Sequence, residues 1–334
     1  MVAKKRLLLG ITALVLIGAL LGFLLHSRST GPARLKLAVV TWVGFGPFYV
    51  AQDKGFFREQ GIDVELLRID DFGARRAALA SGKLDGSVET IDSLAIGLAQ
   101  GIPAVEVLLV DESYGGDGIV ATRDIKSLAD LSGKTVALAK TTPSHFFLLY
   151  LMDQASLNPA TITIKPMDAG DAGAAFVAGK VDAAVTWEPW LGKAKDTPRG
   201  HILTTSREHP GIIADCFVVH PDLARNRPEA VKALLRAWFK AIDFLKSDGP
   251  EAIAIISKRL ELPAADLEGM LQGVRFPSYE DNMRFMGVGG GDNRMEQMFS
   301  AALRLWQKEG VIAADKKIAP ASVYNPAFLR DMNK

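Results

Sequence analysis

Residues 78–85 read Ala-Leu-Ala-Ser-Gly-Lys-Leu-Asp, and 97 positions later residues 175–182 read Ala-Phe-Val-Ala-Gly-Lys-Val-Asp. A second pair of similar segments precedes them at an offset of 98: Lys36-Leu-Ala-Val-Val-Thr41 and Lys134-Thr-Val-Ala-Leu-Ala139. Similar segments that keep their order at nearly one offset indicate an internal duplication. The sequence therefore predicts two copies of one structural unit.

Each copy reads as strand, loop, helix, strand, helix, strand. Short runs of Val, Leu and Ile alternate with helical patterns, and this alternation favours parallel βαβ units. Glycines that follow the last periodic residue of a helix mark its expected end. In the first copy we expect strands at 36–41, 63–69 and 84–89 and helices at 47–59 and 72–81. In the second copy we expect strands at 134–139, 161–165 and 181–186 and helices at 143–155 and 171–178.

Two such units predict an α/β fold of two lobes with a ligand cleft between them. The segment 104–121 is expected to cross from the first lobe to the second, and 212–220 has the pattern of a strand that returns. Helical patterns dominate the rest of the chain, with helices expected at 227–247, 250–260, 263–275 and 293–309. The expected lobes are discontinuous: 34–112 begins the first lobe, 118–212 forms the second, and 216–334 completes the first.

The N-terminal residues have the pattern of an export segment. Lys4, Lys5 and Arg6 precede the run 7–25, which contains 19 residues without a charge. A basic region before such a run is typical of a signal peptide, and the run is also long enough for a membrane anchor. We expect residues 1–30 to be a signal peptide or an uncleaved anchor, and the protein to be periplasmic or otherwise extracytoplasmic.

Composition excludes several classes of protein. Residues 31–334 contain 35 basic and 38 acidic residues, a formal charge of −3, which argues against a nucleic-acid binder. Cys216 is the one cysteine, so no internal disulfide can form, and we expect it to be buried. The sequence contains no phosphate-binding loop, nucleophile motif or histidine spacing typical of a metal site. We therefore expect no cofactor, no metal and no catalytic residue.

Candidate ligand contacts follow the predicted strands. In open parallel sheets, ligands bind beyond the carboxyl ends of the strands, where helix N-termini present free N–H groups. Polar or aromatic residues stand at several of these ends, and others stand in the crossover between the lobes. The candidates are Trp42, Gly46, Thr90, Asp92, Ser113, Thr141, Ser144, Trp187 and Glu188.

Several candidates have a structural alternative. Trp42 fits a core position as well as a ligand contact. Thr90 or Asp92 is suited to cap the helix that follows, since short polar side chains accept hydrogen bonds from free N–H groups there. Ser113 lies in a glycine-rich crossover that is compatible with an ordinary turn. Glu188 can cap the next helix and never meet a ligand.

A set of motifs connects the chain to a known family. The segments are Trp42-Val-Gly-Phe-Gly-Pro47, Ala51-Gln-Asp-Lys-Gly55-Phe56-Phe57, Ala80-Ser-Gly82-Lys-Leu-Asp85-Gly86 and Asp182-Ala-Ala-Val-Thr-Trp187-Glu188-Pro189. Together they resemble the nitrate/sulfonate/taurine-type family of ABC transporter substrate-binding proteins, which also includes binders of pyrimidine precursors. The resemblance covers about residues 36–330. It implies a type II periplasmic-binding-protein fold, closure of the lobes on a small-molecule solute, and delivery to a permease and its ATPase. We expect a monomer, held at the membrane only if the N-terminal segment is uncleaved.

The charge of the solute does not follow from the resemblance. Asp111, Asp117, Glu188 and Asp215 are placed where they could face the cleft, and no arginine or lysine is clearly placed beside them. Carboxylates near a bound anion would repel it. We therefore favour an amine-bearing or zwitterionic solute, or a nitrogen heterocycle, over a bare oxyanion; taurine carries both charges and remains compatible.

Two other functions stay open. Relatives that resemble pyrimidine synthases are enzymes of the same fold, but they carry a cysteine-rich motif and act inside cells. This chain departs from both features, since it has one cysteine and an export segment. If that segment is never cleaved, a membrane-anchored periplasmic sensory module is the third possibility.

Overall fold

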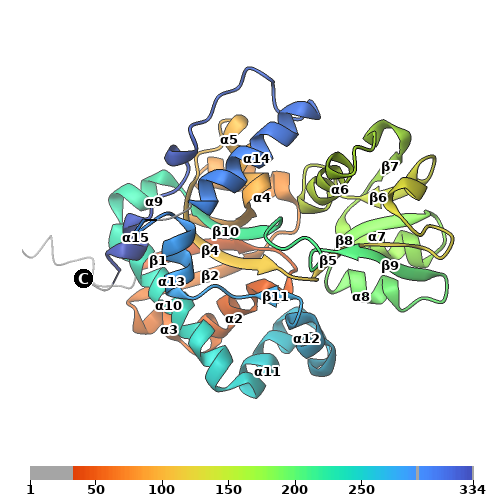
Figure 1. The fold of residues 1–334 in the computed structure, drawn as a ribbon. Coiled ribbons are helices and arrows are strands. Elements are labelled where there is room, and N and C mark those ends of the chain that lie inside the picture. The colour runs from red at the N-terminus through yellow and green to blue at the C-terminus, as the bar shows by residue number, and fades with distance from the viewer. Residues whose placement is uncertain (1–32, 291–292, 333–334) are drawn as a thin grey trace, which may run out of the picture. The chain divides into compact units, whose positions relative to one another are not determined.

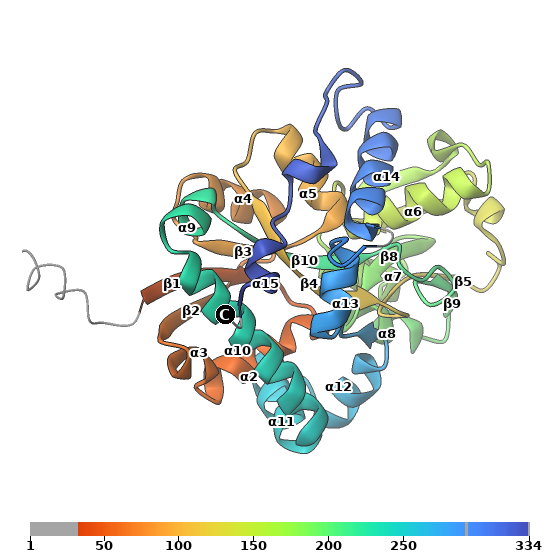
Figure 2. The ribbon, with the colours of Figure 1, turned by 60° about the vertical axis from the view of Figure 1, so that its left-hand side comes forward.

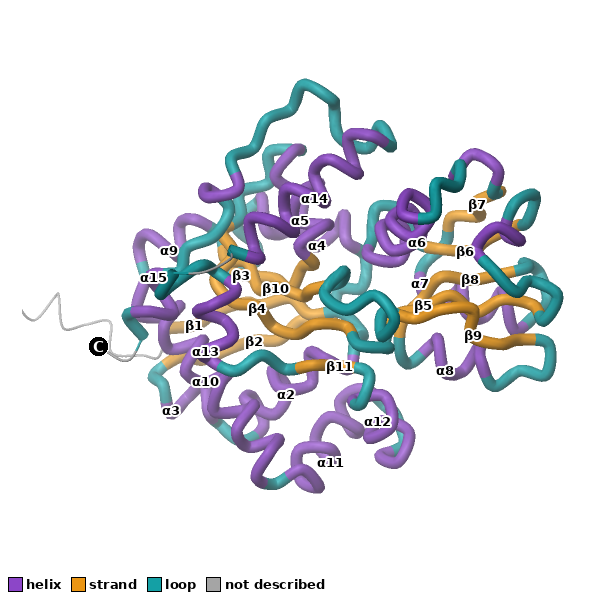
Figure 3. The backbone as a smooth tube through the Cα atoms, in the orientation of Figure 1, coloured by secondary structure: helices purple, strands orange, loops and turns teal. Residues whose placement is uncertain are grey.

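The computed structural model describes residues 33–290 and 293–332, and their strands form two separate sheets of six and five strands (Figures 1 and 3). We call the six-stranded sheet and the helices that cover it the first lobe, and the five-stranded sheet with its helices the second lobe. The predicted export segment lies outside the described residues. Within the described ranges, none of the helices has the length and apolar character needed to cross a membrane.

The first lobe has the strand order β11-β4-β10-β3-β1-β2. Its strands are β1 (Ala33–Val39), β2 (Ile62–Arg68), β3 (Gly86–Thr90), β4 (Val105–Ser113), β10 (Ala214–Val219) and β11 (Val274–Arg275). Its helices are α2 (Gly46–Asp53), α3 (Phe56–Glu59), α4 (Phe72–Ala80), α5 (Ile91–Ala99), α9 (Pro221–Asn226), α10 (Pro228–Ser247), α11 (Gly249–Leu260), α12 (Ala264–Leu271), α13 (Tyr279–Phe285), α14 (Arg294–Lys308) and α15 (Ala327–Arg330). Helices α5 and α14 pack together on one side of the sheet, and α2, α10 and α11 cover the other side (Figure 2).

The second lobe has the strand order β7-β6-β8-β5-β9. Its strands are β5 (Asp117–Thr122), β6 (Thr135–Leu138), β7 (Thr163–Pro166), β8 (Ala183–Trp187) and β9 (Gly200–Thr205), and its helices are α6 (Pro143–Gln154), α7 (Ala169–Val177) and α8 (Trp190–Lys195). Short 3₁₀ turns lie at Val43–Phe45, Leu128–Leu131, Pro159–Thr161 and Pro320–Ser322.

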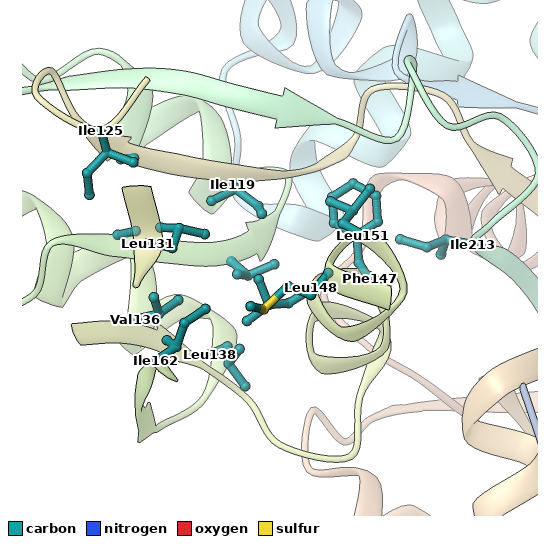
Figure 4. Close-up of a cluster of buried hydrophobic side chains, with 14 residues drawn as sticks. Ile119, Ile125, Leu131, Val136, Leu138, Phe147, Leu148, Leu151, Ile162 and Ile213 are labelled. Carbon is teal, nitrogen blue, oxygen red and sulfur yellow. The ribbon is translucent and has the colours of Figure 1, made fainter. Parts of the chain in front are cut away.

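Both faces of the second sheet are buried, because successive side chains of a strand point to opposite faces. Val136 and Leu138 of β6 pack with Phe147 of α6 in one apolar cluster (Figure 4). Ala137, between them in sequence, packs with Phe176 of α7 in a second cluster. Helices on both faces explain why the strands read as nearly continuous apolar runs.

The predicted duplication is visible in the topology. The order β2-β1-β3 in the first lobe matches β7-β6-β8 in the second, with parallel pairing between β1 and β3, β6 and β7, and β6 and β8. Each set is extended by one antiparallel strand, β10 beside β3 and β5 beside β8. The two-sheet α/β architecture is therefore confirmed. Segments 114–116 and 206–213 connect the sheets, and the lobe limits at 34–112, 118–212 and 216–334 stay a prediction.

Several local predictions were wrong. The sheets are not purely parallel, because β5 and β10 follow the two connections between the lobes and enter their sheets in the reverse direction. The helix expected at 47–59 is divided into α2 and α3 at Gly55, whose φ of 76° is left-handed and open to glycine at little cost. The helix expected at 263–275 ends at Leu271, since Val274 and Arg275 pair with β4.

One acidic side chain is buried in the first lobe without compensation. Glu106 of β4 has no exposed surface, and neither of its carboxyl oxygens has a hydrogen-bond partner among the described residues. Burial raises its pKa from 4.5 to about 8, because a carboxylate without a partner is poorly stabilised away from water. Glu106 is therefore protonated in the folded protein at neutral pH.

This burial predicts a pH-dependent gain of stability in Glu106→Gln. An acid with a raised pKa contributes most to the free energy of unfolding below pH 4.5, and that contribution falls as the pH rises to about 8. We therefore compare the change in the free energy of unfolding that Glu106→Gln causes at two pH values. This change should be about 3 kcal/mol more stabilising at pH 7 than at pH 4.5. Urea unfolding at several pH values measures this difference. The exposed Glu268→Gln is the control, and an effect of Glu106→Gln that is the same at every pH would contradict the prediction.

Candidate ligand-binding site

A cavity of about 20 Å³ lies where the two lobes meet. In the described arrangement of the lobes it has room for about one water molecule. We call it the cleft pocket. Its walls are Val40, Trp42, Phe45, Phe72, Arg75, Val88, Glu89, Thr90 and Asp215 from the first lobe, Asp117, Pro143 and Trp187 from the second, and Ile213 from the connection.

Strand register explains why polar side chains converge here. Asp215 of β10 is paired with Thr90 of β3 on one side and with Asp111 of β4 on the other. In the second lobe, Asp117 of β5 is paired with Trp187 of β8. Paired residues of antiparallel strands place their side chains on the same face. Two short rows of polar and aromatic side chains therefore meet at the cleft.

The row in the first lobe contains a carboxyl pair. Asp111 and Asp215 are paired across β4 and β10, and each acts on the pKa of the other. Burial raises the pKa of Asp111 to about 7, and burial together with the charge of Asp111 raises that of Asp215 well above its usual range. The Trp42 indole donates a further hydrogen bond to Asp111 Oδ2 over 3.1 Å. Trp42 thus helps to hold the pair in place.

Asp117 stands at the junction of the two lobes. Burial raises its pKa to about 7, and a hydrogen bond with Ser113 partly opposes that rise. The Ser113 hydroxyl accepts a hydrogen bond from the Asp117 amide at 3.1 Å and lies 2.7 Å from the Ser206 hydroxyl. Ser206 in turn accepts a hydrogen bond from the Gly115 amide. The two connections between the lobes are therefore joined by one hydrogen-bond network.

Two arginines of α4 carry the positive charge at the site. Arg75 lines the cleft pocket and is 1 % exposed; Arg76, beside it, is also buried. Both lie near Glu89, at 4.0 Å from Arg75 and 3.4 Å from Arg76. We did not expect an arginine in the wall of the pocket that Asp117 and Asp215 also line. A signal was present in the sequence, since Arg75 and Arg76 follow the carboxyl end of the strand expected at 63–69.

Trp187 links the two lobes across the cleft. Its indole N–H donates to the Thr41 carbonyl in the first lobe over 3.0 Å. A second contact between the lobes joins α14 and α6. The ring centroid of Trp306 lies 5.5 Å from that of His145 and 5.6 Å from that of Phe146. Burial lowers the pKa of His145 to about 4, so its imidazole is neutral at physiological pH. The described structure therefore holds the lobes in contact.

The nine predicted contacts fall into two groups. Trp42, Thr90 and Trp187 line the cleft pocket. The other six do not line it: Gly46, Asp92, Ser113, Thr141, Ser144 and Glu188. Ser113 belongs to the network between the connections, and Asp92 lines a separate groove formed with α6 and α14.

The remaining four have local roles or lie elsewhere. Gly46 allows α11 to pack closely, since a Cβ there would lie 2.6 Å from the Ile256 side chain. Thr141 lines an outer groove beside Asp70, and its hydroxyl donates to the Lys140 carbonyl. Ser144 is buried in the first turn of α6. The Glu188 carboxylate accepts a hydrogen bond from the Gly192 amide at 3.0 Å. This contact fits the role of a helix cap, which was the alternative to ligand contact.

The site shows no arrangement for a metal. In 33–290 and 293–332, no three His, Cys, Asp or Glu side chains are grouped so that they could hold a metal ion. Cys216 is fully buried in β10, and burial raises the pKa of its thiol well above the usual range. A thiol in such surroundings is not activated as a nucleophile.

Comparison with known proteins identifies the family of the chain. The family model described as NMT1/THI5 like matches residues 42–252, which is more than half of the chain. The chain belongs to the NMT1/THI5 like family. The matched residues include β3, β10 and most of the cleft pocket.

Members and structural neighbours of this family bind small solutes. The chain is 27 % identical over 239 residues to the taurine-binding periplasmic protein of Escherichia coli, covering 68 % of this chain and 73 % of the relative. The solved periplasmic aliphatic sulphonate binding protein SsuA of Escherichia coli has a TM-score of 0.73 at 19 % identity, covering 88 % and 97 % of the two chains. The periplasmic nitrate-binding protein NrtA of Synechocystis has a TM-score of 0.70 at 19 % identity, covering 90 % and 88 %. These two structures establish the predicted periplasmic-binding-protein fold.

The position of Glu188 predicts different effects for two substitutions. Glu188→Ala leaves the Gly192 amide without its acceptor and should lower the free energy of unfolding by about 1 kcal/mol. Glu188→Gln keeps an acceptor oxygen and should cost less. Urea unfolding of both variants measures this order. A solute that raises the melting temperature of the unaltered protein should do so equally in Glu188→Gln; loss of that response would place Glu188 in the binding site.

Proposed function

We propose that the protein is the extracytoplasmic solute-binding component of an ABC importer. It captures a small polar solute that contains nitrogen or sulfur and delivers it to a permease driven by an ATPase. One observation carries the proposal: the walls of the cleft pocket come from both lobes, with Asp117 and Trp187 on one side and Thr90 and Asp215 on the other. A solute can touch all of them only when the lobes are together.

The connections between the lobes support a mechanism of closure. Segments 114–116 and 206–213 join the sheets, and Gly115 has a φ of 114°, a conformation that side chains rarely adopt. Short connections of this kind allow two rigid lobes to rotate. Solute binding then favours the closed state, because the contacts with both walls exist only there.

The relatives support the class of solute and the location. Their names give taurine, aliphatic sulfonates and nitrate as ligands, all of them small and polar, and several are named as periplasmic. By this likeness we propose that the protein works outside the cytoplasm as a monomer. Attachment to the membrane depends on residues 1–30, which also decide between transport and a membrane-anchored sensory module. N-terminal sequencing of the exported protein tests that point.

An enzyme of the same fold is the other class of function, because a fold by itself does not determine activity. The one cysteine of the chain, Cys216, is buried within β10 and away from the walls of the cleft pocket. The residues of the pocket are better suited to holding a solute than to activating a nucleophile. We therefore propose binding without chemical change, and recovery of the bound solute unaltered after incubation tests it.

Solute binding should be measurable by melting temperature and by scattering. The panel contains taurine, alkanesulfonates, nitrate, amines, ureas and pyrimidines. A solute at about 100 times its Kd stabilises the folded state by about 2.7 kcal/mol, which raises the melting temperature by several degrees. Small-angle scattering should then show a smaller radius of gyration with that solute. If no member of the panel changes either quantity, the proposed transport function fails.

The two tryptophans of the cleft pocket should contribute strongly to affinity. Trp187→Phe keeps an aromatic ring but loses the hydrogen bond to Thr41, and should weaken binding about two- to ten-fold. Trp187→Ala also loses the ring contact and should weaken binding by about ten-fold or more. Calorimetry with the best solute of the panel measures both. Phe239→Ala, on α10 outside the pocket, is the control. Unchanged affinity in both Trp42→Ala and Trp187→Ala would show that the cleft pocket is not the binding site.

A further inference from the structure

The cleft pocket contains groups of opposite charge that come from different lobes. Arg75 lines it from α4 of the first lobe, and Asp117 lines it from β5 of the second. Asp215 of β10 adds a second acidic group. All three side chains are buried, with 1 %, 4 % and 7 % of their surface exposed. Such charges are costly in a closed site unless a bound group compensates them.

Arg75 retains unused hydrogen-bonding capacity. Its Nη1 donates to the carbonyls of Ile69 and Asp70 at 2.9 and 3.3 Å. Its Nη2 lies 4.0 Å from Glu89, too far for a hydrogen bond, and its buried Nε has no hydrogen-bond partner among the described residues. A guanidinium with free donors in a pocket wall is suited to an anionic group of a ligand.

The charge of Arg75 is not cancelled by its neighbours. Glu89 is the one carboxylate that forms ion pairs with Arg75, and it also pairs with Arg76, whose Nη2 is nearer at 3.4 Å. Two guanidinium groups thus share one carboxylate, which leaves a surplus positive charge at this side of the pocket. Asp70 and Asp71 lie close enough to act on Arg75 through their charges, but neither lines the cleft pocket.

On the side of the cleft pocket that contains Asp117 and Asp215, acidic groups are in excess. Asp117 is near Asp111, Asp92 and Glu188, each of which raises its pKa. Asp215 is paired with Asp111, whose charge raises its pKa in the same way. A positively charged nitrogen placed between Asp117 and Asp215 would stabilise both in their ionised form.

We propose that the cleft pocket binds a small zwitterion, with its anionic group on Arg75 and its cationic nitrogen on Asp117 and Asp215. This inference rests on the proposed transport function. A bare anion would meet Asp117 and Asp215 without compensation, and a bare cation would leave the donors of Arg75 unused. The rings of Trp42 and Trp187 supply apolar surface for the short chain between the two charges.

Calorimetry on the mature protein at pH 8 tests the proposal with matched sets of solutes. Taurine, β-alanine and glycine are the zwitterions; ethanesulfonate, propionate and acetate lack the amine, and ethylamine and methylamine lack the acid. At least one zwitterion should bind ten-fold or more tightly than both of its one-charge analogues. If each zwitterion is matched in affinity by one of its one-charge analogues, or if no zwitterion binds below 1 mM, the proposal is overturned.

Substitutions then assign each end of the solute. Asp117→Asn should weaken the zwitterion at least ten-fold and should not weaken its analogue without the amine, because the substitution removes a carboxylate that repels an anion. Arg75→Gln should weaken the zwitterion similarly and should not weaken the analogue without the acid. Asp315→Asn, an equal loss of charge at an exposed residue outside the cleft pocket, is the control. If a variant does not fold by circular dichroism, the comparison of solutes on the unaltered protein still decides.

Failure of this inference is distinguishable from failure of the proposed function. If nitrate or a simple sulfonate compacts the protein in scattering and every zwitterion is inert, transport stands and the zwitterion is wrong. If no solute of any class binds, the transport function itself fails. Equal loss of affinity for a zwitterion and both analogues in Asp117→Asn and Arg75→Gln would show a structural role for these residues and overturn the assignment.

Discussion

Strand β10 enters the first sheet between β3 and β4, and this pairing positions Asp215 beside Thr90 and Asp111 at the cleft. The chain leaves the first lobe at Ser113 and returns at Ala214, so β10 runs against both of its neighbours. The pairing fixes Asp215 between Thr90 and Asp111 at the edge that faces the second lobe. A shift of one residue would turn Asp215 to the other face and bring Cys216 into its place.

The same pairing explains why the site tolerates several buried carboxyl groups. Burial raises the pKa values of Asp111 and Asp215, and the Trp42 indole donates a hydrogen bond to Asp111, so part of the cost of burial is offset within the first lobe. Asp117 approaches from the second lobe and is held by Ser113 at the connection. The acidic groups therefore belong to both rigid bodies, and their repulsion depends on how far the lobes are closed.

The arginines of α4 give the pocket its second charge. Their burial is possible because backbone carbonyls and Glu89 accept from them, and because the Arg75 guanidinium stacks 4.2 Å from the centre of the Phe72 ring. Guanidinium groups tolerate such surroundings better than an ammonium group, since their charge is delocalised and weakly hydrated. The cleft pocket thus has a basic side and an acidic side.

The sequence by itself determined the duplication, the two α/β units and the ends of strands at which Trp42, Thr90 and Trp187 stand, because periodicity and glycine positions are local properties. Only the tertiary structure decided that β5 and β10 run antiparallel and that Arg75 joins the pocket. These features depend on which strands become neighbours and which way a helix turns its side chains. Such choices are made by contacts between residues far apart in the chain, and no local pattern carries them.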